Sequence, residues 1–113
     1  MIFSWLRARR RRKRLAEPFP IRFLAIIERN VGHYALLPDP LRAKLRNATT
    51  ILLAEKRWLG RSGLFANEEM RVTIAAQAAL LLLGREDYFD SVREVVVFPT
   101  TFRTPRPEDG WED

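Results

Sequence analysis

The chain has 113 residues, no cysteine, a hydrophobic fraction of 47% and a formal net charge of +6. Its length suits a single domain, and the absence of cysteine excludes disulfides and thiolate chemistry. Seven of the 20 basic side chains lie between residues 7 and 14, and the remaining 13 are balanced by 14 acidic ones. The folded body is therefore close to neutral, so any binding of polyanions is expected from the N-terminal tail.

Residues 1–17 join an apolar start, MIFSWL, to a basic block, RARRRRKR. The apolar part is too short for a secretory signal and precedes the charges instead of following them. We expect a disordered, solvated arm, because a block of like charges repels itself. Two alternatives stay open, namely attachment to an anionic membrane surface and binding of nucleic acid. The basic side chains are Arg7, Arg9, Arg10, Arg11, Arg12, Lys13 and Arg14.

Apolar residues recur at helical spacing in two segments after the tail. The first predicts an amphipathic helix over residues 20–30, ended by Gly32. The second predicts a helix over residues 40–57, with Asp39 as its N-cap. The segment WLGRSGLFA that follows contains two glycines and is expected to form a turn.

The stretch from Asn67 to Gly84, NEEMRVTIAAQAALLLLG, is the main structural signal. Asn67 is a plausible N-cap and Gly84 a helix stop. Between Ile74 and Leu83 every residue except Gln77 is apolar, so we expect a helix buried on nearly all sides. The run is shorter than the roughly 20 residues that cross a bilayer. Gln77 is expected to hydrogen-bond to a neighbouring backbone group that the sequence does not identify.

Residues 95–98, VVVF, predict a short strand buried on both faces. A single strand cannot satisfy its own backbone, and the remaining residues, with two further prolines after Pro99 and a cluster of acids, are a poor source of partners. The expected fold class is mainly α (α+β), with three helices and one short strand. The expected organisation is a basic tail (1–17), a helical body (18–103) and an acidic, proline-containing tail (104–113).

No complete active site is visible in the sequence. The one histidine, His33, is read as a loop residue, and the serines lack a nucleophile motif and an oriented base. Adjacent acids on a helix point about 100° apart, so neighbouring carboxylates cannot share a proton across one substrate. We therefore predict no catalytic, cofactor-binding or metal-binding residue. The serines are Ser4, Ser62 and Ser91, and the adjacent acids are Glu68 with Glu69 and Glu86 with Asp87.

Four segments in suitable order resemble the N-terminal part of the zinc-dependent peptidases of the Mlc titration factor A family. They are PFP followed by IERNV, then LLAEKRW, then GLFANEEMRVTIAAQAALLLLG, and finally EVVVFPTTF. The resemblance runs over residues 18–102, and its most specific part is EMRVTIAAQAALLLLG.

The resemblance implies a cytoplasmic metallopeptidase whose zinc is bound by two histidines of an HExxH helix and a further ligand downstream, with the motif's glutamate as general base. This sequence contains no HExxH, so no zinc ligand or catalytic residue is carried over. We expect an N-terminal scaffold that is inactive alone and holds no cofactor, and we favour a fragment over a natural short relative.

The expected partners are the missing C-terminal catalytic half and, by resemblance, a transcriptional regulator. The alternative function is a stand-alone protein-interaction module. The expected location is cytoplasmic. The basic tail also suggests peripheral attachment to a membrane as an alternative.

Overall fold

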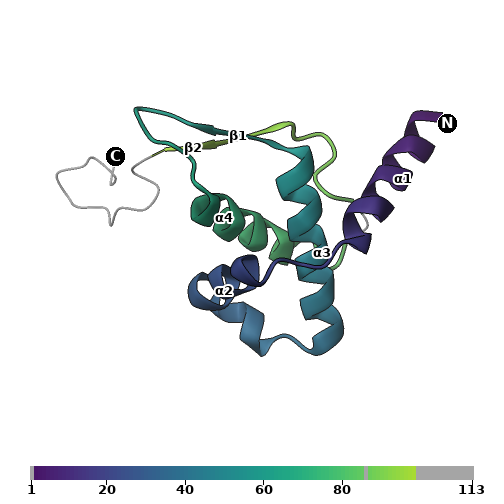
Figure 1. Cartoon of the computed structure of the whole chain (residues 1–113), viewed down its shortest axis with the longest axis horizontal. Helices are drawn as coiled ribbons and strands as arrows, with labels where there is room; N and C mark the ends of the chain where they lie inside the picture. The colour runs from purple at the N-terminus through teal and green to yellow at the C-terminus, as the bar shows by residue number, and fades with distance from the viewer. Residues whose placement is uncertain (1, 86, 99–113) are drawn as a thin grey trace.

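The computed structural model describes residues 2–85 and 87–98. Helices dominate, and a small two-stranded parallel sheet lies beside them (Figure 1), which confirms the mainly α, α+β fold class. The described residues form four α-helices, where three were expected. The elements in chain order are α1 (Ile2–Ala16), α2 (Ile21–Asn30), the 3-10 helix η1 (Gly32–Leu36), α3 (Asp39–Glu55), β1 (Arg57–Gly60), α4 (Glu68–Leu81) and β2 (Glu94–Val97).

The core lies where α2, α3 and α4 meet. α4 packs against both of the other helices. Ile27 from α2, Leu45 from α3, and Val72 and Ala76 from α4 have no exposed surface. The helical periodicity therefore identified the core-facing sides of α2 and α3 correctly, because these helices turn their apolar stripes to α4.

Helix ends follow the sequence signals in part. The Asn67 side chain accepts a hydrogen bond from the Met70 N–H at 2.9 Å, which confirms the predicted N-cap of α4. Asp39 is the first residue of α3 and not its cap, and its carboxylate pairs with Arg42 at 3.3 Å. α3 also ends earlier than expected, because the N–H of Arg57 bonds to a carbonyl beside β2 and starts a strand.

The predicted strand has a partner. β1 comes from the segment expected to be a turn and pairs in parallel with β2, with Trp58 opposite Val95. The expectation of an unpartnered strand is therefore wrong. Burial on both faces is also wrong, since Val97 is 1% exposed and Val96 is 38% exposed. The helices cover the face that carries Val97, and the described elements leave the other face open.

A tight turn follows β1. Ser62 and Gly63 have positive φ angles of 56° and 82°, in the left-handed region. Gly60 lies so close to the backbone carbonyl of Leu64 that a Cβ atom at Gly60 would overlap it. The sequence signal for a turn was thus correct for residues 61–64, and the strand simply begins before them.

All-round burial of α4 is not observed. Gln77 is exposed and Leu81 is 72% exposed, so Gln77 has solvent available and needs no buried backbone partner. The buried positions are confined to the side that faces α2 and α3, namely Val72, Ala75, Ala76 and Ala79. α4 therefore carries more apolar side chains than the described residues bury.

The basic tail is helical. Residues 2–16 form α1, which lies at the side of α3 at the periphery of the molecule (Figure 1). This corrects the expectation of a disordered arm, and the reason is that some of the basic side chains find carboxylates on the body. The predicted acidic tail, residues 104–113, lies outside the described residues.

Candidate functional site

One of the concave features of the described residues is an apolar trough. It lies between the end of α3, the sheet, α4 and the segment before β2, with a volume of about 230 Å³. This volume is below the roughly 300–1,000 Å³ of pockets that enclose small ligands. We therefore read it as a surface for packing. Its principal lining residues are Leu52, Trp58, Ile74, Ala78, Val92 and Val95.

The apolar wall continues out of the trough along α4. Ile74, Ala78 and Leu81 follow one another at successive turns of the helix, so they share one side of it. Ile74 and Ala78 are half-buried, whereas Leu81 is 72% exposed. The trough and this stripe form one apolar surface that the described residues leave uncovered.

Two polar groups border the trough. The Lys56 ammonium donates a hydrogen bond to the carbonyl of Phe89 at 2.7 Å, and its pKa is lowered because burial disfavours the charged form. The Trp58 indole Nε1–H is buried and has no acceptor among the described residues. An unpaired buried donor costs on the order of 1–3 kcal/mol.

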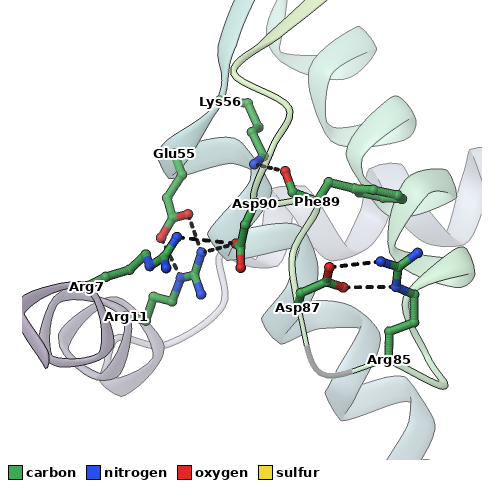
Figure 2. Close-up of polar contacts among 8 residues, drawn as sticks. All are labelled: Arg7, Arg11, Glu55, Lys56, Arg85, Asp87, Phe89 and Asp90. Carbon is green, nitrogen blue, oxygen red and sulfur yellow. Dashed lines mark hydrogen bonds and ion pairs between the residues drawn. The ribbon is translucent and has the colours of Figure 1, made fainter. Parts of the chain in front are cut away.

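A second polar cluster joins α1 to the body (Figure 2), and we call Arg11, Glu55 and Asp90 the Arg11 clasp. The Arg11 guanidinium donates to both carboxylate oxygens of Glu55, at 2.7 and 2.8 Å, and to Asp90 at 2.7 Å. It also stacks 4.7 Å from the ring centroid of Tyr88. Arg7 lies 3.8 Å from Asp90.

The charges of the clasp stabilise each other. The hydrogen bonds to Glu55 raise the pKa of Arg11, and the hydrogen bond from Arg11 lowers the pKa of Asp90. Two residues of the basic block, Arg7 and Arg11, thus form ion pairs with carboxylates of the body. These contacts were not predicted from the sequence, although Arg7, Arg11 and Leu15 recur there at helical spacing. The structure shows all three half-buried.

The adjacent acids at the start of α4 connect it to α2. Glu68 pairs with Arg22 at 2.9 Å, and Glu69 pairs with Arg29 at 3.1 Å and accepts from Asn30 at 3.0 Å. These hydrogen bonds lower the pKa of both carboxyl groups. The two acids make separate contacts, so they do not form a catalytic pair.

Of the other acidic pair the structure describes Asp87 alone, and it also describes the histidine. Asp87 pairs with Arg85 at 2.8 Å (Figure 2), and Glu86 lies outside the described residues. His33 is exposed in η1.

The described residues do not fit a zinc ion. Within residues 2–85 and 87–98, no three histidine, aspartate or glutamate side chains lie close enough together to hold a metal. A zinc site needs three or four such ligands, often histidines, and the sequence has one histidine. No catalytic step through zinc is derived for this chain.

A search of the same residues for membrane-spanning helices finds none that is long and apolar enough to cross a bilayer.

Comparison with known proteins identifies the family. The chain is 29% identical over 96 residues to an uncharacterized protein, slr2042, of Synechocystis sp. (strain ATCC 27184 / PCC 6803 / Kazusa). The alignment covers 83% of this chain and 34% of that protein, so the chain spans about a third of the length of its relative. No solved structure matches. The family model described as glucose-regulated metallo-peptidase M90 matches residues 5–112, and the chain therefore belongs to this metallopeptidase family.

Proposed function

We propose that this chain is the helical N-terminal scaffold of a zinc-dependent metallopeptidase domain and that it hydrolyses no peptide alone. Membership of the metallopeptidase family supports the reaction class. The absence of HExxH from the sequence and the lack of a fitting donor set among the described residues support the inactivity. The length of the relative leaves room for a larger catalytic part.

The uncovered apolar surface of α4 carries the proposal. A helix end that exposes Leu81 forgoes about 1.5–3 kcal/mol that full burial of a leucine would contribute. The occupant that we propose for the trough is the HExxH-bearing part of the same family domain.

In this arrangement the chain would contribute support and not chemistry. α4 and the sheet would form one wall against which the catalytic part packs. A cytoplasmic location and a transcriptional regulator as partner belong to the same proposal, and both rest on the family resemblance.

The test measures zinc content and peptide hydrolysis of the purified 113-residue chain. We expect no stoichiometric zinc and no turnover. Zinc-dependent hydrolysis that a chelator abolishes would refute the proposal.

Reading the coding DNA downstream of codon 113 in all three forward frames gives an independent test. An HExxH segment there would support a scaffold that belongs to a longer peptidase. If the segment is missing, and if the chain is monodisperse, melts cooperatively and binds no hydrophobic dye, the stand-alone interaction module is the better description.

A further inference from the structure

The outer face of α1 is strongly basic. The basic residues divide into two sets, since Arg7 and Arg11 are half-buried against the body and the other five are exposed. In the part of the chain that the structure describes, the ion pairs of α1 involve only Arg7 and Arg11. Five exposed positive charges of α1 therefore have no described counter-charge, on Arg9, Arg10, Arg12, Lys13 and Arg14. The first four lie about 100° or more around the helix from Arg11 and form the outer face.

The helix geometry separates this face from the clasp. At 100° per residue, Arg9 and Lys13 each lie about 160° around the helix from Arg11. The bidentate contact of Arg11 with Glu55 fixes the rotation of α1 about its own axis. The clasp thus turns Arg9 and Lys13 away from α3 and toward solvent, with Arg10 and Arg12 at the edges of the same face.

Two exposed aromatic rings lie at the N-terminal end of the same helix. Phe3 is 80% exposed and Trp5 is 54% exposed. The Arg9 guanidinium lies 5.5 Å from the centroid of the Trp5 ring. Tryptophan and phenylalanine beside a row of basic residues are typical of helices that lie in the interface of a bilayer.

We propose that the outer face of α1 binds the surface of an anionic phospholipid bilayer. Trp5, about 120° around the helix from Arg11, enters the interface, and the four outer cations lie over the lipid headgroups. The near-neutral body adds little attraction or repulsion of its own. Duplex nucleic acid would use the same cations but has no apolar layer for the Trp5 ring, so the bilayer suits the whole face better.

The test compares the full chain on two kinds of vesicle by sedimentation. One kind is phosphatidylcholine alone, and the other contains phosphatidylglycerol as well. We expect binding to the second only, and we expect it to weaken steeply with salt. Equal binding to both vesicles, or binding to neither, would overturn the proposal.

Paired variants locate the binding face. The double variant Arg9→Gln/Lys13→Gln should weaken binding about 25-fold, at about fivefold per cation lost near the surface. The matched control Arg61→Gln/Arg93→Gln removes two exposed charges elsewhere and should change affinity less than about twofold. An equal loss in both variants would show attraction by net charge alone and would overturn the assignment to α1.

The variant Trp5→Ala separates a bilayer from other polyanions. It should weaken binding to the anionic vesicles and leave binding to duplex DNA unchanged. If Trp5→Ala leaves vesicle binding intact while duplex DNA binds more tightly than vesicles, α1 is a nucleic-acid arm and the proposal fails. Circular dichroism of each variant checks that helicity is retained.

Discussion

Replacing Arg11 with glutamine removes the main attachment of α1 to the body. The wild-type side chain makes three short hydrogen bonds to two carboxylates and is only 16% exposed. Hydrogen bonds to charged groups contribute about 1.5–3 kcal/mol each. The partners Glu55 and Asp90 are 29% and 33% exposed, so after the substitution water can hydrogen-bond to their carboxylates and offset much of the lost free energy. We expect the docking of α1 to weaken by about 1–2 kcal/mol.

Limited digestion with trypsin measures the weakened docking at α1 itself, because the basic block offers many cleavage sites once α1 detaches from the body. When opening and closing are fast relative to cleavage, the rate follows the population of the open form. A loss of 1–2 kcal/mol then corresponds to cleavage about 5–30 times faster. The products, followed by mass spectrometry, should come from residues 7–14 before any other site is cut.

Arg7→Gln is the matched control, since it removes the same charge and one tryptic site from the same helix. Arg7 lies 3.8 Å from Asp90 and is 43% exposed, so its contribution is expected to stay under about 0.5 kcal/mol. Its cleavage rate should change by less than about threefold. If both variants are cut at the wild-type rate, the clasp does not hold α1, and the assignment of the cations to two faces fails with it.

Four further outcomes follow from single positions, each measured by urea unfolding unless stated. Asn67→Ala should lower stability by about 0.5–2 kcal/mol and Asn67→Asp should retain most of it, because either side chain can cap α4; equal losses would contradict the cap. Gly60→Ala should cost about 1–3 kcal/mol because its Cβ would overlap a backbone carbonyl, whereas Gly84→Ala, which has open space, should be nearly neutral. Leu81→Gln should change stability by less than about 0.5 kcal/mol and should reduce self-association in analytical ultracentrifugation, and a large destabilisation would mean that Leu81 is buried in solution. The pKa of Asp90 is lowered below its ordinary 3.8, so Asp90 stabilises the fold above pH 3.8, and this contribution is lost as the pH falls through the lowered value. Asp90→Asn should therefore reduce the fall in the free energy of unfolding at acidic pH.

Local patterns predicted the helices α2, α3 and α4 and the N-cap of α4. The N-cap of α4 could be read from the sequence because a side chain and a backbone group three residues apart determine it. The strand β1 could not be read in this way. It has four residues, ends in Gly60, and forms only because β2 pairs with it from 37 residues further along. Its strand character therefore comes from a distant partner and not from its own sequence.

The candidate surfaces were predicted less well for a related reason. The apolarity of α4 was visible, but which side remains open depends on where α2, α3 and the sheet come to lie. The role of Arg11 was hidden because one of its partners is 44 residues away and the other 79. A block of like charges looks uniform in a sequence. Only the fold shows which of these residues form ion pairs with the body and which are exposed without a described partner.

The Arg11 clasp also bears on the order in which the chain can fold during synthesis. α1 leaves the ribosome before α2, α3 and α4, yet Asp90 follows Arg11 by 79 residues. The α2–α4 core can assemble before Asp90 is available, because domains fold from contacts that are already available. We expect α1 to be fixed in place only after that core has formed. Until then its cations stay free to meet any anionic surface near the nascent chain.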